Sequence, residues 1–321
     1  MTNKGEVDLN RYRKSPRLLA EPMERALGTG GELNPILVAV ANDPLLRLDI
    51  RTRRFNVYYC GGSLMTVKGC TQPWVAHFDG KYFNGGRHQQ PDLPPNVTTE
   101  AEARKWVGAF PALRAGMDDW WTRHPKTERD HCQSMAQANA GRVAAPGTDY
   151  IVLDLEYQWA QRRVDLVAAK RKPTETDAAG WTEPDLVFIE VKSCWGTCIG
   201  KSGLANHASD YHEITRARAG RCVQDIKREF ERMVAQKTRL GLLDKSLGFR
   251  KFSSAIPQFL IVFVDLDPNE SGPKRELDTI RAVANSLGAT DRICLMRLKS
   301  DNCRMHAVDA VPLQQFVAGI A

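Results

Sequence analysis

Residues 163–171, RVDLVAAKR, and residues 184–193, PDLVFIEVKS, decide the fold. Both stretches are rich in apolar and β-branched residues, which predicts two buried strands. Because side chains alternate between the faces of a strand, Glu190 and Lys192 lie side by side on one face of the second strand. Asp165 stands among apolar neighbours in the first strand, where an acid is unfavourable unless something binds it. These three residues are the first candidates for a functional site.

Two carboxylates and an ammonium group on adjacent strands suit the hydrolysis of a phosphodiester. Mg²⁺ prefers hard oxygen ligands, and one or two carboxylates with waters and a substrate phosphate complete its shell. The ion activates water and neutralises charge on the phosphate, while a nearby lysine orients or deprotonates that water or stabilises the transition state. The structural alternative is a buried ion pair of Asp165 and Lys192, with Glu190 at the end of a strand.

The flanking segments predict a mixed α/β core. Residues 127–130, TERD, resemble a capping box and open a helix that runs to about residue 139. A strand over 150–157 and the strand over 163–169 are separated by a short polar turn, which predicts a hairpin. Further expected elements are a helix over 209–236, a buried strand over 259–264, a helix over 273–287, strands over 292–298 and 304–308, and a short helix over 312–317.

The N-terminal third has a different pattern. Short alternating runs between residues 46 and 78 predict an antiparallel meander. Residues 84–99 are rich in glycine, proline and polar residues and mark a boundary. Helices are expected over 18–27, 100–107 and 112–123. The predicted organisation is an N-terminal antiparallel β-rich accessory region over 1–98 and, over 99–321, an α/β core with a mixed central sheet flanked by helices.

Composition favours a polyanionic partner. The formal net charge is +7. Binding of a basic protein to nucleic acid is favoured because it releases counterions from the phosphate backbone. The alternative is that the basic residues form solvated faces of the protein. The first 14 residues, MTNKGEVDLNRYRK, contain no apolar core of a signal peptide, and no apolar run approaches the roughly 18 residues of a membrane span. We therefore expect a cytoplasmic protein without a membrane partner, whose eight cysteines are reduced.

The strings VDLVAAK and FIEVKS resemble the PD-(D/E)XK nuclease superfamily. In that family a helix precedes a hairpin, the aspartate begins the second hairpin strand, and the ExK motif lies on the third strand. Residues 127–192 follow this order, and the resemblance is limited to them. It implies a restriction-endonuclease-like core, Mg²⁺ or Mn²⁺ as cofactor, Asp165 and Glu190 as metal ligands, and Lys192 as the catalytic lysine.

The resemblance extends the set of candidate residues. Family members often carry an acid on the preceding helix, and Glu128 matches it, although the helix dipole also favours acids in a first turn. Glu156 is a further candidate metal ligand, whose orientation depends on the hairpin register. The candidates for contacts with substrate phosphate are Lys201, Ser202, His207 and Tyr211.

The predicted function is a Mg²⁺-dependent endonuclease that acts on nucleic acid, with DNA as the expected substrate. Restriction or antiphage defence is the setting expected by analogy, and a homodimer is expected because many such enzymes act as dimers. Two alternatives stay open: a nuclease-fold module that binds nucleic acid or a partner protein without cutting, and a hydrolase of a small phosphorylated substrate. Cys194 and Cys198 with His207 and His212 form a further alternative, a zinc site.

Overall fold

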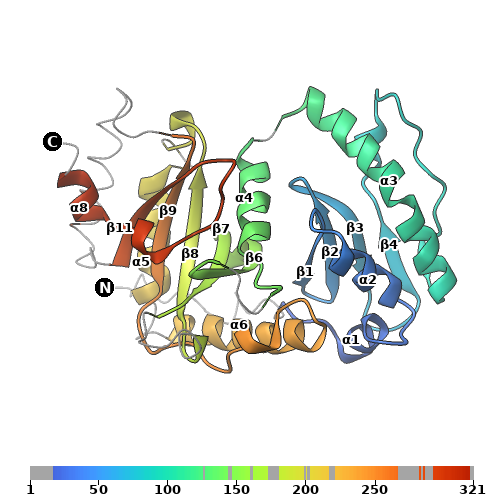
Figure 1. Ribbon diagram of the computed structural model, residues 1–321, viewed down its shortest axis with the longest axis horizontal. Coiled ribbons are helices and arrows are strands. Elements are labelled where there is room, and N and C mark those ends of the chain that lie inside the picture. Colours follow the sequence, from blue (N-terminus) through green and yellow to red (C-terminus); the bar gives the residue numbers. More distant parts are fainter. Residues whose placement is uncertain are drawn as a thin grey trace, which may run out of the picture.

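The computed structural model describes residues 17–125, 127–143, 147–159, 162–172, 181–198, 200, 203–216, 221–266, 282, 285 and 292–318. The described chain forms two sheets that lie side by side (Figure 1). The N-terminal sheet is an antiparallel meander in sequence order, as its alternating runs predict. Its strands are β1 (Arg47–Arg51), β2 (Arg54–Tyr59), β3 (Gly62–Lys68), β4 (Trp74–His77) and β5 (Asn96–Val97).

Three helices belong to this N-terminal unit: α1 (Glu21–Leu27), α2 (Asn34–Asn42) and α3 (Glu100–Arg123). Helix α3 is continuous, so the prediction of two helices is wrong. Thr99 and Glu102 form a complete capping box, and Pro111 lies on the exposed face while one apolar face stays buried along the whole helix. Although α3 follows the predicted boundary at residue 98, it packs against α2, β3 and β5.

The second sheet is mixed. Its six strands lie in the order β11-β10-β9-β8-β7-β6. β8, β9 and β10 are parallel, whereas β6 with β7, β7 with β8, and β10 with β11 pair antiparallel. The predicted hairpin and the mixed sheet flanked by helices are confirmed. The strands are β6 (Tyr150–Trp159), β7 (Arg162–Lys170), β8 (Asp185–Lys192), β9 (Gln258–Val264), β10 (Ile293–Leu298) and β11 (Val311–Pro312).

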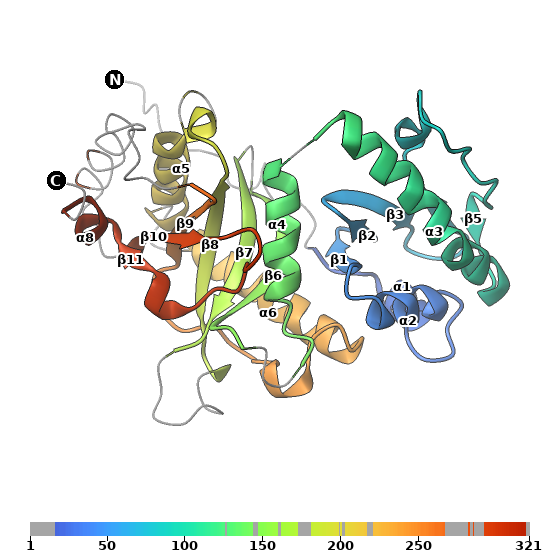
Figure 2. The ribbon, with the colours of Figure 1, turned by 45° about the horizontal axis from the view of Figure 1, so that its top comes forward.

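Helices cover both faces of this mixed sheet (Figure 2). Helix α4 (Thr127–Ala138) packs on one face, against the core that contains Leu166 and Val187. Helices α5 (Leu204–Arg216) and α6 (Arg221–Arg239) pack on the other face, against Val167 and Phe188. The single helix predicted over 209–236 is therefore two helices. Helix α8 (Leu313–Ala318) ends the described chain.

In the C-terminal part, one predicted strand is absent from the described residues and one predicted helix is described at only two residues. Residues 304–308 do not form the predicted strand, because the backbone of Met305 bonds outside the sheet. Its N–H donates to Asn139 Oδ1 at 3.0 Å, and its carbonyl accepts from the N–H of Asp149 at 3.0 Å. Of the helix predicted over 273–287, only residues 282 and 285 are described, and both are helical.

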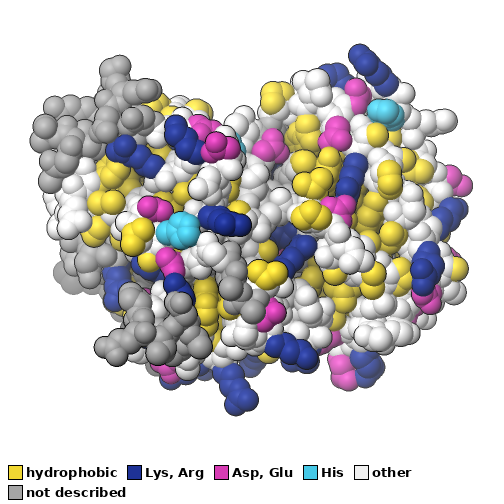
Figure 3. Space-filling model, viewed as in Figure 1, with side chains coloured by type: hydrophobic (Ala, Val, Ile, Leu, Met, Phe, Trp, Pro, Cys, Tyr) yellow, Lys and Arg dark blue, Asp and Glu magenta, His cyan; other side chains and the backbone are white. Residues whose placement is uncertain are grey.

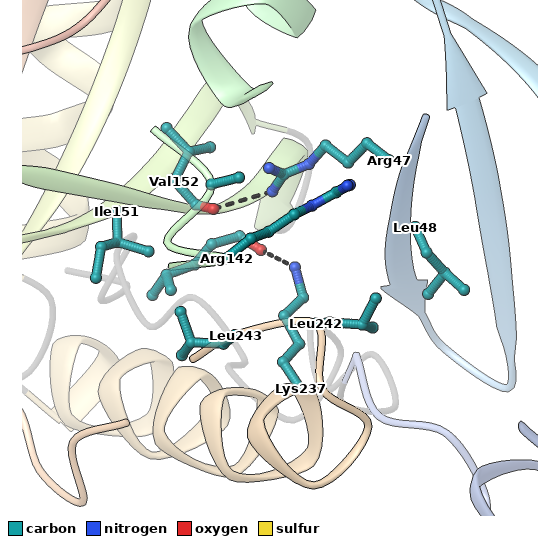
Figure 4. A pocket seen from close by; sticks show the side chains of 10 residues that line it. Arg47, Leu48, Arg142, Ile151, Val152, Lys237, Leu242 and Leu243 are labelled. Carbon is teal, nitrogen blue, oxygen red and sulfur yellow. Dashed lines mark hydrogen bonds between the residues drawn. The ribbon is translucent and has the colours of Figure 1, made fainter. Parts of the chain in front are cut away.

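Buried ion pairs join the two units where β1 meets β6 and α6. Asp49 accepts from Arg47 Nε at 2.9 Å and from Lys237 Nζ at 3.0 Å, and it is fully buried. Both cations also donate to the backbone of β6, at Val152 and Leu153 (Figure 4). The cavity beside them measures about 20 Å³. Breaking such a pair strongly destabilises the fold, because the remaining charge stays buried without a partner. The interface therefore fixes the N-terminal unit on the mixed sheet.

Candidate active site

The pairing of β7 with β8 places the two candidate metal ligands together. The register pairs Leu166 with Ile189, which are the chain neighbours of Asp165 and Glu190. Residues opposite one another in an antiparallel pair point to the same face. The N–H of Val191 donates to Asp165 Oδ2 at 3.0 Å, which holds this carboxylate against β8. Asp165 and Glu190 therefore lie close together, where the pairing of β7 with β8 ends.

Glu190 also contacts an ammonium group and an imidazole. Lys192 Nζ lies 2.7 Å from Glu190 Oε1, and His207 Nε2 on α5 lies 2.9 Å from the same oxygen. The side chains of Glu190 and Lys192 are only 3% and 2% exposed, so these contacts are shielded from solvent. One oxygen of this carboxylate is thus held by the protein, while the other, Oε2, is buried without a hydrogen-bond partner among the described residues.

The electrostatics show an excess of negative charge. Burial, together with the charges of Glu190 and Glu128, raises the pKa of Asp165 to about 7. Burial lowers the pKa of Lys192, but the attraction of Glu190 outweighs it, so the pKa lies above its ordinary value. The pKa of His207 is raised for the same balance of reasons. A bound cation would relieve the repulsion between Asp165 and the carboxylates of Glu190 and Glu128.

Glu128 joins this cluster from the first turn of α4. Its side chain lines the pocket beside Asp165, and its Oε2 atom is buried without a hydrogen-bond partner among the described residues. A buried carboxylate oxygen without a partner is unfavourable unless a ligand or an ion takes its place. The structure therefore brings the predicted helix acid close to the two strand acids.

Glu128 and Asp165 line a pocket of about 370 Å³, whereas Glu190 and Lys192 are not among its lining residues. That volume falls within the range of roughly 300–1,000 Å³ that small-ligand sites occupy. The surface is hollowed between the two lobes at the end of the molecule where α4 begins (Figures 1 and 3). The lining residues are Thr127, Glu128, Arg129, Cys132, Glu156, Arg163, Asp165, Ser193 and Thr197.

Glu156 lies at this pocket but is held by arginines. Its neighbours on β6 pair with Leu166 and Val164, so Glu156 stands opposite Asp165 in the hairpin register. Its Oε1 atom accepts from Arg129 at 3.1 Å and from Arg163 at 3.5 Å. In this structure the carboxylate of Glu156 is therefore a counter-ion of two arginines.

Two of the predicted substrate-binding residues, His207 and Tyr211, have different surroundings in the structure. His207 contacts Glu190, as described above. Tyr211 does not reach the pocket: it is 3% exposed, its hydroxyl donates to the carbonyl of Pro257 at 2.6 Å, and its ring stacks on Phe259. Lys201 and Ser202 lie outside the described residues. The zinc set is not assembled, because His207 binds Glu190 and Cys198 Sγ contacts the carbonyl of Cys194 at 3.8 Å.

Sequence reasoning missed several residues of the pocket. Arg163 carried a usable signal, because it lies two residues before Asp165 on the same strand and so shares its face. Arg129 follows Glu128 in a helix, where consecutive residues point in different directions, and nothing in its spacing indicated the pocket. Ser193 and Thr197 follow the ExK strand, where the loop has no repeating pattern to interpret.

The donor set fits a hard divalent cation in its chemistry. In the part of the chain that the structure describes, no group of three or more His, Cys, Asp and Glu side chains is arranged to hold a metal ion. Mg²⁺ does not need such a group, because one or two carboxylates suffice beside waters and substrate oxygens. Asp165 and Glu190 supply two, and the unpartnered Oε2 atoms of Glu190 and Glu128 are available as further oxygen donors.

Comparisons with known proteins add no relative. The chain has no significant match to a protein-family model, to a curated protein or to a solved structure. Among the described helices, none combines the length and the apolar character that crossing a membrane requires.

Proposed function

We propose that the protein is a divalent-metal-dependent nuclease that hydrolyses phosphodiester bonds, with DNA as its substrate. The observation that carries the proposal is the meeting of Asp165 and Glu190 across β7 and β8, with Lys192 bound to Glu190. The cluster lines or adjoins an open pocket that also contains two arginines. Carboxylates for a cation and basic groups for phosphate are the two requirements of this reaction.

Asp165 and Glu190 would hold the cation, which is Mg²⁺ or Mn²⁺, with Glu128 beside them. When bound, such an ion polarises a phosphate oxygen and lowers the pKa of a water molecule. The protein's own contribution is to fix the carboxylates before substrate arrives. The bond from Val191 N–H orients Asp165, and the contacts of Lys192 and His207 orient Glu190. Such pre-organisation lowers the reorganisation that the reaction needs.

Lys192 would act on the phosphate. Its Nζ atom is anchored on Glu190 Oε1 and is almost fully buried, so its position is defined. An ammonium group has three donors, and one of them is used by Glu190. The others can donate to an oxygen of the scissile phosphate and offset the charge that develops there.

The order of elements supports a restriction-endonuclease-like core for this chain. Helix α4, the β6–β7 hairpin and β8 follow one another as in the PD-(D/E)XK nucleases that the sequence resembles. Asp165 stands on the second hairpin strand, and Glu190 and Lys192 stand on the third. A role in restriction or antiphage defence, a cytoplasmic location and action as a homodimer complete the proposal.

The test is metal-dependent cleavage by the purified full chain. Plasmid DNA, single-stranded DNA and RNA are incubated with Mg²⁺ or Mn²⁺, with a chelator as the blank. We expect cleavage by the wild type, and a loss of at least 100-fold in Asp165→Asn, Glu190→Gln and Lys192→Ala, because oriented charged groups each contribute on the order of 10²–10³ to rate. Glu213→Gln, on the exposed side of α5, is the matched control. Full activity in the three site variants would refute the assignment.

A catalytically inactive module that binds nucleic acid is the second candidate. The observation in its favour is that Lys192 and His207 already neutralise Glu190 without a cation. Such a module would bind DNA with equal affinity in a chelator and in Mg²⁺, and it would show no turnover. Glu190→Gln would then leave the affinity for DNA unchanged.

A further inference from the structure

Two arginines meet at the mouth of the pocket. Arg129 comes from the first turn of α4, and Arg163 comes from β7, so they approach from different elements. Both contact the same atom, Glu156 Oε1, at 3.1 and 3.5 Å. Their side chains are 44% and 59% exposed, and all three residues line the pocket. Solvent and ligands therefore reach this group freely.

The two arginines carry more hydrogen-bond donors than the carboxylate of Glu156 accepts from. Each guanidinium has five N–H donors, and one carboxylate oxygen accepts from both in this structure. Among the described residues, the side chains of Arg129 and Arg163 donate hydrogen bonds only to Glu156. Two positive charges against one negative charge leave a net positive charge at the mouth, whereas the floor of the pocket is acidic.

The spacing along β7 relates this group to the proposed reaction centre. Arg163 and Asp165 are two residues apart, so their side chains leave the same face about 7 Å apart along the strand. Successive phosphates of a nucleic-acid strand are separated by a similar distance. A strand with one phosphate at Asp165 and Glu190 would thus bring a neighbouring phosphate to Arg163.

We propose that Arg129 and Arg163 form a clamp for the phosphate next to the scissile one, and that Glu156 holds both arginines in position until that phosphate displaces it. This inference rests on the proposed function, since it takes the scissile phosphate to lie at Asp165 and Glu190. Guanidinium groups suit the task, because their planar donors match phosphate oxygens in pairs. Glu156 then acts as a positioning residue, in place of the metal ligand that the sequence suggests.

The clamp defines the class of substrate. A molecule with a single phosphodiester would fill the reaction centre and leave the arginines paired with Glu156. A substrate with at least two successive phosphates would engage both subsites and gain their charge-assisted hydrogen bonds. The clamp therefore favours polynucleotides over small phosphodiesters and reads no base sequence.

Binding without turnover tests the clamp directly. A short fluorescent oligodeoxythymidylate is titrated in a metal chelator, and its affinity is measured by anisotropy over a range of salt concentrations. Each phosphate contact to single-stranded DNA contributes about 0.7 to the slope of log K against log salt. We expect Arg129→Ala and Arg163→Ala each to reduce the slope by about 0.7, and the double variant by about 1.4. Arg228 is exposed on α6, outside the lining of the pocket. Arg228→Ala therefore removes one positive charge away from the clamp and should leave the slope of log K against log salt unchanged.

Glu156→Gln distinguishes the clamp from a metal site. Without its counter-ion the arginine pair is available to phosphate, so we expect tighter binding of the oligonucleotide in the chelator. A metal-ligand role for Glu156 would give no gain in metal-free affinity and a loss of Mg²⁺-dependent cleavage.

Kinetics complete the test. The p-nitrophenyl ester of thymidine 5′-phosphate is compared with the same ester carrying a 3′-phosphate. The wild type should show a lower KM for the second compound, and the double arginine variant should lose that preference. Intact cleavage with unchanged salt slopes in both arginine variants would overturn the clamp and leave the nuclease proposal standing. Arginine-dependent binding without any cleavage would show a phosphate site at the two arginines but overturn both hydrolysis and the relation of that site to a scissile phosphate.

Discussion

Asp165→Asn should make the metal-free protein more stable at alkaline pH. Asp165 is buried beside Glu190, and its negative charge is repelled by Glu190 and by Glu128. Asparagine keeps the size of the side chain and an oxygen that accepts from the N–H of Val191, but it removes the charge. A substitution that stabilises the fold while it abolishes activity is typical of a residue retained for function.

The magnitude follows from the pKa of Asp165, which rises from an ordinary 3.8 to about 7. At about 1.4 kcal/mol per pH unit, this rise corresponds to a penalty of up to about 4 kcal/mol for the ionised group above pH 7. The sign is definite. Between pH 4 and 7 the folded state binds the proton that the unfolded state has lost, so the contribution of Asp165 to stability falls as pH rises. The advantage of the asparagine variant should therefore be full near pH 8 and disappear near pH 4.

Urea denaturation in a chelator, at pH 8 and at pH 4.5, measures both values. Asp154→Asn is the matched control, because Asp154 is also buried but forms ion pairs with Arg17 and Arg51. Neutralising it leaves two arginines without their partner, so we expect a loss of about 3–5 kcal/mol. If Asp165→Asn were destabilising at pH 8 to a similar extent, the acid would be structural, and the reasoning from excess negative charge would be refuted.

Three further predictions follow from the site, the interface and the core. Mg²⁺ or Mn²⁺ at 100 times its dissociation constant should stabilise the wild type by about 2.7 kcal/mol in thermal unfolding, and Glu190→Gln should remove this effect; equal stabilisation of both proteins would place the ion elsewhere. Lys237→Met should lower the free energy of unfolding by about 3–5 kcal/mol in urea, because Asp49 loses a buried partner, and a loss below 1 kcal/mol would contradict a structural role for this interface. Trp106→Ala should cost about 3–5 kcal/mol, because Trp106 is buried where α3 packs on the N-terminal sheet, and unchanged unfolding would contradict that packing.

The elements around the site could be predicted because their signal is local. The strands β6, β7 and β8 show the expected apolar patterns, and the short turn between β6 and β7 allows only a hairpin. Parity alone placed Glu190 and Lys192 on one face. The fact that Asp165 lies beside Glu190 depends on how β7 pairs with β8, which residue spacing does not determine.

The rest depended on contacts between distant residues. Glu156 faces the pocket because the β6–β7 register shifts between Val152 and Asp154, and such a bulge has no reliable sequence signal. The bond between Lys237 and Asp49 joins residues 188 positions apart. Tyr211 was assigned to the substrate because of its position after the ExK strand, but packing against Phe259 determines its place.

A crystal of the full chain soaked in Mn²⁺ gives the most direct test of the central claim, because the anomalous scattering of manganese locates the ion without assumptions about its ligands. We expect one peak within about 2.0–2.3 Å of a carboxylate oxygen of Asp165 and of Glu190, in keeping with metal–oxygen distances of hard divalent cations. No peak at these carboxylates, or a peak bound only by other residues with Asp165 and Glu190 unmoved, would contradict a nuclease centre at this site.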